Sequence, residues 1–196
     1  VLFLALGDLD RDGRIDIVTA ARESRLLLFL GTSTGFTEHS IPLPDKFRYG
    51  KGVAIGDIDG DHQPDLVMAN RGDPKKRAVS WISYRDSPTS GKWTTTRISD
   101  AAGSKFDLVQ LVDVDGDGDV DAFVSNNQQT NTSNRTWFND GNGQFTESGG
   151  NIGPVGEYNN GVALGDLDND GDQDLVVAAV VIVLFAENDG NGHFEL

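Results

Sequence analysis

The sequence contains no cysteine, so neither disulfides nor thiolate metal ligands can stabilise this protein. It also lacks an apolar run of about 18 residues and a basic leader followed by an apolar segment, and therefore predicts neither a transmembrane helix nor a signal peptide. No amphipathic stretch of helical length occurs, which disfavours a helical fold. Because the sequence begins at Val1 within a strand-like run, we expect a mature product or a fragment.

Basic residues are few, with 16 Lys and Arg against 31 Asp and Glu and a net charge of −15. This balance argues against nucleic acid and against insertion into, or binding to, an anionic membrane. Eighteen of the acidic residues lie in four nine-residue segments, which are Asp8–Asp16, Asp57–Asp65, Asp113–Asp121 and Asp166–Asp174. Clustered carboxylates repel one another by roughly 1 kcal/mol per pair even in water. The acidity is therefore local and favours a bound cation.

Each nine-residue segment, called an acidic loop below, carries aspartate at positions 1, 3, 5 and 9. A tight turn can aim these carboxylates at one point, where only a hard cation such as Ca²⁺ would neutralise them. Position 7 would add its backbone carbonyl, so its side chain need not be acidic. The predicted calcium ligands are Asp8, Asp10, Asp12, Arg14 and Asp16; Asp57, Asp59, Asp61, Gln63 and Asp65; Asp113, Asp115, Asp117, Asp119 and Asp121; and Asp166, Asp168, Asp170, Asp172 and Asp174.

Position 6 of each acidic loop must turn sharply. Gly13, Gly118 and Gly171 supply the unhindered φ that this turn needs. The second loop has His62 instead, at an expected cost of order 1 kcal/mol for a left-handed backbone. We therefore expect the second calcium site to be the weakest, with His62 pointing to solvent rather than binding the ion.

The spacing of the loops predicts a repeat fold. Their first aspartates are separated by 49, 56 and 53 residues, which is the period of propeller blades and solenoid repeats. We predict one repeat domain over 1–196, with blades at approximately 1–47, 48–106, 107–159 and 160–196.

Short apolar, β-branched runs flank every loop, such as Val53–Ile55 and Leu66–Met68, and read as buried strands. A third strand, a glycine-containing turn and a fourth strand follow. The fourth strand opens with an aromatic residue in each unit, namely Phe36, Trp93, Phe145 and Phe194. Four antiparallel strands per repeat describe an all-β fold, the β-propeller.

Two details refine this prediction. An EF-hand is excluded because flanking helices are absent and position 12 lacks the required Glu, being Thr19, Met68, Val124 and Val177. The run Leu175–Phe185 lacks a polar turn, which predicts either a very tight hairpin around Ala178 and Ala179 or an irregular last unit.

The segments Asn160–Val177 and Trp137–Phe145 carry nearly the whole pattern of a known family. The chain resembles the FG-GAP/VCBS repeats of integrin-type calcium-binding β-propellers. The resemblance implies one Ca²⁺ per blade hairpin, up to four in all, an extracellular or cell-surface setting, and roles in adhesion, glycan binding or scaffolding. Relatives usually have seven or eight blades. The four blades could thus be part of a larger propeller, a closed ring, or half of a ring completed by another chain.

For function we expect an extracellular calcium-stabilised scaffold that binds a glycan or an extracellular protein. We expect no enzyme, because no nucleophile elbow, phosphate-binding glycine loop, zinc helix or paired histidines occur. Two alternatives stay open. The chain could assemble with itself as a structural subunit of an extracellular fibre, or form the propeller portion of a polysaccharide-active enzyme.

Three further signals are weaker. Arg71-Gly72-Asp73 matches an adhesion tripeptide, although an ordinary turn is the better interpretation. Asn131 and Asn134 begin N-glycosylation sequons, which matter only in a source that glycosylates. Three tryptophans are expected at a recurring position of the units, where they pack between blades, with stacking on sugars as the alternative; they are Trp81, Trp93 and Trp137.

Overall fold

The computed structural model describes residues 3–20, 24–44, 50–70, 78–99, 106–126, 134–149, 152, 159–179 and 182–195. These ranges contain sixteen strands in four four-stranded sheets and no helix, which confirms the predicted all-β fold of four-stranded antiparallel blades. No helix capable of crossing a bilayer is found in them. The tripeptide Arg71-Gly72-Asp73 and the sequon residue Asn131 lie outside the described residues.

Each sheet is a meander whose strand order follows the chain. The first sheet contains β1 (Leu4–Gly7), β2 (Asp16–Ala20), β3 (Arg25–Thr32) and β4 (Gly35–Pro42), and the second contains β5 (Gly50–Gly56), β6 (Asp65–Asn70), β7 (Ala78–Tyr84) and β8 (Trp93–Arg97). The third contains β9 (Phe106–Val112), β10 (Asp121–Asn126), β11 (Arg135–Asn139) and β12 (Phe145–Glu147), and the fourth contains β13 (Asn159–Gly165), β14 (Asp174–Ala179), β15 (Val183–Asn188) and β16 (Phe194–Glu195).

The acidic loops connect the first two strands of every sheet, and position 9 of each loop begins the second strand. In the third sheet, for example, Asp121 pairs with Val112 on the other side of the hairpin. The aromatic residues predicted to open the fourth strands lie at or next to their first residues, as with Trp93 in β8. The apolar run of the fourth sheet contains the end of β14 and the start of β15, where Ala178 pairs with Val183 and the Ala179 amide donates to the Ile182 carbonyl at 2.9 Å. Ala178 and Ala179 are thus strand residues and not the turn that the sequence suggested.

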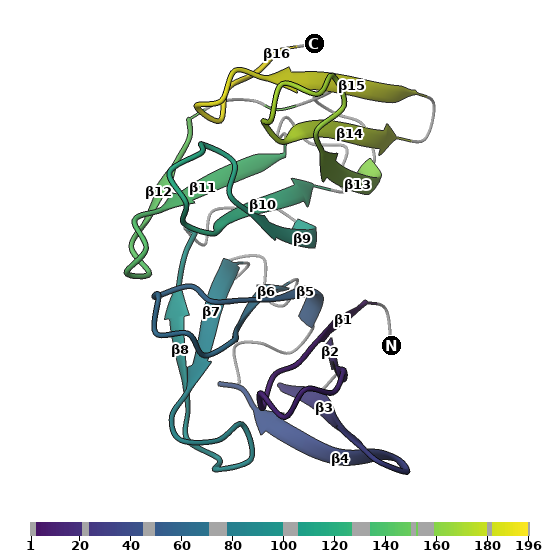
Figure 1. Ribbon diagram of the computed structural model, residues 1–196, viewed down its shortest axis with the longest axis vertical. Helices are drawn as coiled ribbons and strands as arrows, with labels where there is room; N and C mark the ends of the chain where they lie inside the picture. The colour runs from purple at the N-terminus through teal and green to yellow at the C-terminus, as the bar shows by residue number, and fades with distance from the viewer. Residues whose placement is uncertain are drawn as a thin grey trace.

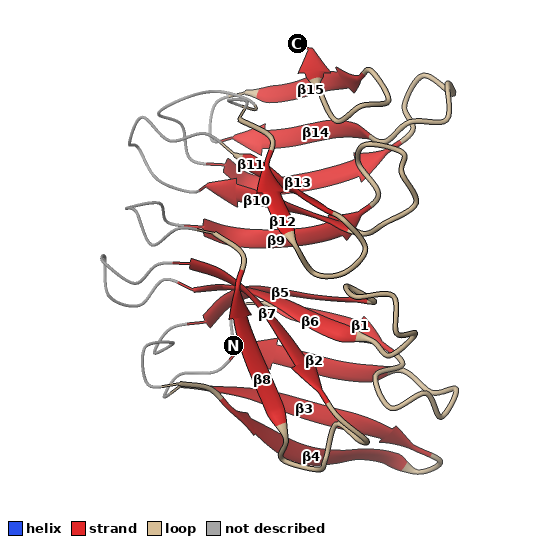
Figure 2. Ribbon diagram, turned by 90° about the vertical axis from the view of Figure 1, so that its left-hand side faces the viewer, coloured by secondary structure: helices blue, strands red, loops and turns tan. Residues whose placement is uncertain are grey.

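The four sheets follow one another along an arc, with the first strand of each sheet toward the concave side (Figure 1). β1 contacts β5, β5 contacts β9, and β9 contacts β13. The acidic loops all project from one edge of the arc (Figure 2). The first and fourth sheets lie at its opposite ends, so the described part of the chain does not form a closed four-bladed ring in this structure.

The core lies between the sheets rather than within them. One buried cluster spans the first and second sheets, with Leu28 and Leu66 among its members. A second cluster joins the second and third sheets, and a third joins the third and fourth. At the concave side, a nearly buried ion pair joins β5 to β9, with Lys51 Nζ 3.2 Å from Asp107 Oδ1. Each sheet is thus stabilised mainly by its neighbours.

The three tryptophans pack between sheets, as predicted, but they do not share a register position. Trp81 pairs with Val67, the second residue after Asp65, whereas Trp137 pairs with Ala122, the first residue after Asp121. These are neighbouring register positions, so the two side chains face opposite sides of their sheets. The recurring position expected from the sequence is therefore wrong. Both residues lie 16 residues after position 9 of their loops, but the pairing of the second and third strands is offset by one residue between the two sheets. Trp137 packs edge-on against Phe106, with ring centroids 5.4 Å apart.

Candidate metal centres

The aspartate at position 9 of each acidic loop is buried and fixes the loop to its sheet. Asp121 shows the arrangement. Its Oδ2 accepts the amide of Val114 at 2.8 Å, and its Oδ1 accepts the amide of Asn139, on the third strand, at 2.8 Å. Asp16 and Asp174 make the same pair of bonds in their own sheets. This structural role adds to the ligand role that the sequence predicts.

The carboxylates at positions 1 and 5 fold the loop around its own backbone. The carboxylate at position 1 accepts the amide of position 6 in all four loops, at 2.8 Å for Asp8, 2.9 Å for Asp57, 3.0 Å for Asp113 and 3.2 Å for Asp166. The carboxylate at position 5 accepts the amide of position 7 at 2.7 to 2.9 Å. These bonds close the loop into a compact turn.

The turn requires left-handed backbone at two positions. At position 6, φ is 85° for Gly13, 94° for Gly118, 103° for Gly171 and 65° for His62. The His62 side chain is 86 % exposed, with Nδ1 3.4 Å from Asp57 Oδ2. Position 4 is also left-handed, at Arg11, Gly60, Gly116 and Asn169. The sequence did not reveal this second requirement, because position 4 varies too much in residue type.

The loops bring carboxylate oxygens within 4.8 Å of one another. In the first, third and fourth loops the three residues come from positions 1, 3 and 9, and in the second loop they come from positions 1, 3 and 5. The groups are Asp8, Asp10 and Asp16; Asp57, Asp59 and Asp61; Asp113, Asp115 and Asp121; and Asp166, Asp168 and Asp174. The remaining predicted side chains, at position 5 of three loops and at Asp65, are not members of these groups.

The electrostatics of the loops favour loss of negative charge. At position 3, burial and then neighbouring carboxylates raise the pKa of Asp10, Asp59 and Asp115 above its usual value. Asp168 accepts a hydrogen bond from the Asp170 amide, which lowers its pKa, but desolvation and the nearby charges outweigh this and raise it overall. The carboxylate at position 3 of every loop is therefore destabilised in its charged form.

Position 9 differs between loops. Burial raises the pKa of Asp65 to about 7 and that of Asp121 to about 6. The pKa of Asp174 is instead lowered, because the amides of Asn188 and Leu167 donate to its carboxylate. Asp65 and Asp121 would thus gain most from a cation that stabilises their charged forms.

The donor set fits a hard divalent cation. Asp57 Oδ1 and Asp115 Oδ1 are buried and accept no hydrogen bond from the described residues. A carboxylate oxygen buried without a donor is costly unless a cation or proton neutralises it. All side chains of the four groups supply carboxylate oxygen, the ligand that Ca²⁺ prefers. We therefore identify the four loops as candidate calcium sites.

The following sheet completes each of the first three loops. The carbonyl at position 2 accepts a hydrogen bond from a side chain 74 to 81 residues away: Leu9 O from Tyr84 Oη at 2.6 Å, Ile58 O from Asn139 Nδ2 at 2.8 Å, and Val114 O from Asn188 Nδ2 at 2.8 Å. Tyr84, Asn139 and Asn188 occupy one register position near the end of the third strand, called the cap position below. Their contacts join each loop to the next sheet.

The arc of four-stranded sheets, with an acidic hairpin loop in each, is the architecture of a β-propeller. The FG-GAP-like repeat family matches residues 8–68 and 113–177, together more than half of the sequence. The chain belongs to this family.

A structural comparison agrees with the fold. The chain resembles a lectin of Agrocybe aegerita, solved for its specific recognition of non-reducing terminal N-acetylglucosamine, with a TM-score of 0.62 and 18 % identity. The similarity covers 97 % of this chain and 50 % of the lectin chain, so the chain spans about half the length of that protein. No protein of curated function matches the chain.

Proposed function

We propose that the protein is a calcium-stabilised binding scaffold rather than an enzyme, with one structural Ca²⁺ in each blade hairpin. The observation that carries this proposal is the raised pKa of the aspartate at position 3 in all four loops, beside two further carboxylates. Calcium would stabilise the charged form of these groups. At about 1 mM Ca²⁺, a site with a Kd of about 10⁻⁴ M would stabilise the fold by about 1.4 kcal/mol, and a site with a Kd of about 10 µM by about 2.7 kcal/mol.

Thermal unfolding in a Ca²⁺ titration, with a chelator as reference and with a count of bound ions, tests the calcium role. We expect the midpoint to rise with Ca²⁺ and about four ions to bind. Asp115→Asn should remove one ion, whereas Asp140→Asn, in the exposed turn between β11 and β12, should remove none. An unmoved midpoint together with fewer than two bound ions would refute the calcium role.

We further propose an extracellular or cell-surface setting. Calcium sites of extracellular modules often have Kd values of about 10⁻⁴ to 10⁻³ M, so they fill only where Ca²⁺ is abundant. Membership of the FG-GAP-like family supports this setting. If titration instead gave sub-micromolar affinity at every loop, the sites would suit an intracellular protein, and the setting would have to be reconsidered.

A glycan is the ligand class that we propose for the scaffold. A cleft of about 500 Å³ lies beside the second acidic loop and is lined by Gln63, Trp81, Ser83, Arg85 and Asp86, among others. An aromatic ring next to planar polar side chains suits a sugar, which presents both apolar C–H faces and hydroxyls. The connection from β7 to β8 that supplies Arg85 and Asp86 is longer than the corresponding connections of the other three sheets, so these two cleft residues are an addition to the repeat.

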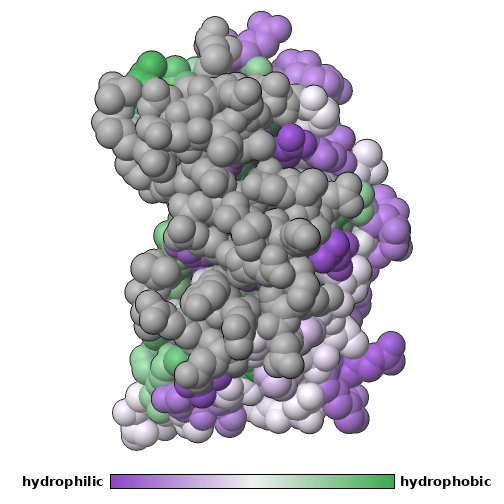
Figure 3. Space-filling view, turned by 180° about the vertical axis from the view of Figure 1, so that it is seen from behind, coloured by the Kyte–Doolittle hydropathy of each residue, from purple (hydrophilic) through white to green (hydrophobic). Residues whose placement is uncertain are grey.

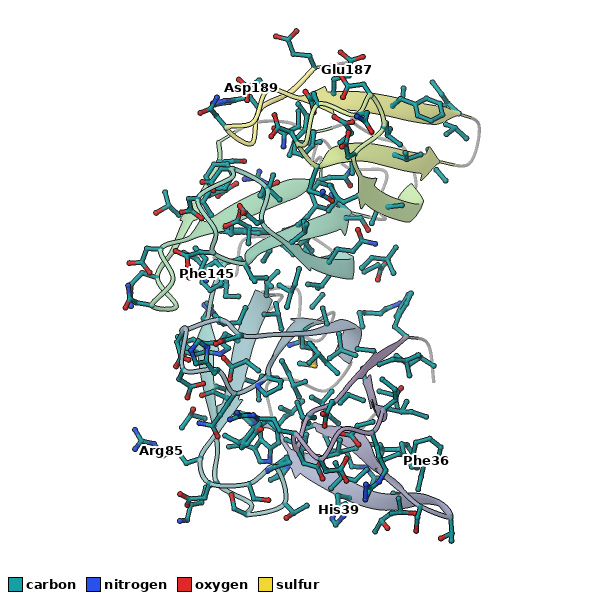
Figure 4. All side chains as sticks on the ribbon, viewed as in Figure 1. Phe36, His39, Arg85, Phe145, Glu187 and Asp189 are labelled. Atoms are coloured by element: carbon teal, nitrogen blue, oxygen red, sulfur yellow. The ribbon has the colours of Figure 1, made fainter. Side chains whose placement is uncertain are left out.

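Arg85 projects outward from this connection (Figure 4). We propose that it donates hydrogen bonds to the bound sugar, while Trp81 supplies the apolar wall. The lectin with the similar fold recognises N-acetylglucosamine, which supports a carbohydrate as ligand.

A glycan array probed with the full chain in Ca²⁺ tests this proposal. Arg85→Ala should weaken binding of the captured glycan at least tenfold without moving the unfolding midpoint. Arg97→Ala, an exposed position on β8 outside the cleft, is the matched control and should leave binding unchanged. If no glycan binds, or if Arg85→Ala binds as well as the unchanged protein, the cleft is not the site. Turnover of a polysaccharide in the same mixtures would favour the enzyme alternative.

A further inference from the structure

The three interfaces between sheets all use the same pair of faces. The face toward the preceding sheet, called the leading face, is formed in the second sheet by Val53, Ile55, Leu66 and Ile82. The face toward the following sheet, called the trailing face, is formed in the first sheet by Leu9, Val18, Leu26 and Leu28. Each internal interface places one trailing face on one leading face.

The fourth sheet presents a trailing face that no described residue covers. Leu167 is 53 %, Val183 54 % and Phe185 61 % exposed. At the corresponding register positions of the first sheet, Leu9, Leu26 and Leu28 are all 0 % exposed. The fourth sheet therefore carries an apolar face of the kind that is buried elsewhere in the molecule.

The first sheet presents the opposite face. Leu4 and Leu6 in β1 are 54 % and 60 % exposed. Their counterparts in the second sheet are Val53, which is 5 % exposed, and Ile55, which packs against the core. The two exposed faces lie at opposite ends of the arc. In Figure 4, Phe36 marks the end with the first sheet and Glu187 the end with the fourth. The view from behind shows hydrophobic residues toward both ends (Figure 3).

We propose that the trailing face of the fourth sheet binds the leading face of the first sheet of a second copy, so that two copies close one propeller ring. Three observations support this occupant. The contact would repeat an interface that the chain already forms three times. The sheets follow a curved arc, and a head-to-tail contact repeated around such an arc generates a ring where the rotation closes. The similar lectin chain is about twice as long as this one.

The new interface differs from the internal ones in one respect. Gly31 occupies the cap position of the first sheet and has no side chain to donate to Leu167 O. A side chain there is excluded, because a Cβ would lie 2.6 Å from the Ile15 carbonyl oxygen. The interface between copies is thus apolar and lacks the cap hydrogen bond. We expect a reversible dimer that is weaker than the contacts within the chain.

Sedimentation velocity of the full chain over a range of concentrations, in saturating Ca²⁺, tests this proposal. We expect a closed dimer at micromolar concentrations. Phe185→Asp, on the trailing face, and Leu6→Asp, on the leading face, should each weaken dimerisation at least tenfold. Thr146→Asp adds the same charge to an exposed position on the outer strand β12 and should leave the dimer unchanged.

Mixing the two variants separates a damaged interface from a damaged fold. The Leu6→Asp copy keeps its trailing face, and the Phe185→Asp copy keeps its leading face. The mixture should therefore dimerise through one intact interface, and more tightly than either variant does alone. A monomer at every concentration, a dimer that both variants leave intact, or an open polymer would each overturn the proposed ring, and the polymer would assign the contact to a fibre.

Discussion

Asn139→Ala should destabilise the protein although the residue lies outside the acidic loops. Asn139 is 3 % exposed, and its Nδ2 donates to Ile58 O at 2.8 Å and to Val120 O at 3.2 Å. Its Oδ1 accepts the amide of Gly143 at 3.2 Å. Alanine removes all three bonds, including the one that joins the second and third sheets.

The magnitude follows from these contacts. A buried hydrogen bond contributes about 1 kcal/mol net, and a buried group left without a partner costs about 1 to 3 kcal/mol. At about 1 kcal/mol for each of the three bonds, we expect a loss of about 3 kcal/mol in total. For a domain of this size, that corresponds to a fall in the melting temperature of about 6 to 12 °C.

Thermal and urea unfolding, followed by tryptophan fluorescence in saturating Ca²⁺, measures this loss. Asn142→Ala is the control, because Asn142 is exposed and its two hydrogen bonds stay within the turn, to Asp140. It should cost less than about 1 kcal/mol. If the two variants unfold at the same midpoint, the cap does not stabilise the interface and the reasoning from its geometry is wrong.

Three further predictions follow from buried or strained groups. Asp107→Ala should lower the free energy of unfolding in urea by about 3 to 5 kcal/mol, because it leaves Lys51 buried without its carboxylate. Replacing both residues by apolar ones should recover most of this loss, and no recovery would contradict the prediction. In chelator, stability should fall as pH rises from about 4 to 7. The reason is that the pKa of Asp65 is about 7 and that of Asp121 about 6 in the folded protein, so over this pH window the folded state binds more protons than the unfolded chain. A stability that rises with pH would refute this. His62→Gly should stabilise the metal-free protein by up to about 1 kcal/mol, because His62 has a left-handed backbone. It should also increase the calcium affinity of the second loop, as measured by calorimetry. An unchanged affinity would mean that the backbone does not limit that site.

The hairpins could be predicted because their signals are local. Aspartates at fixed spacing, Gly13 and its counterparts, and short apolar runs specify loop and strands within about 25 residues. The positive φ of His62 followed from the same pattern. Local pattern also gave the order of the strands, because an antiparallel meander pairs neighbours in sequence.

The contacts between sheets could not be predicted in the same way. Tyr84 and Asn139 perform the same task with unlike side chains, and their partners lie 75 and 81 residues away. Only alignment of the strands to position 9 of their loops shows that the two residues correspond. The cleft beside the second loop was missed for a related reason, since Arg85 and Asp86 belong to a connection that departs from the repeat.

The cap hydrogen bonds all run in one direction, from a later sheet to the loop before it. Among the described residues no side chain donates to Leu167 O, so the fourth sheet presents the acceptor of this contact without its donor. A further repeat with a donor at its cap position would donate to this carbonyl, and its own loop would present the next carbonyl without a donor. Each sheet thus presents one acceptor for the sheet after it, so the number of repeats can change in evolution without redesign of the blades already present.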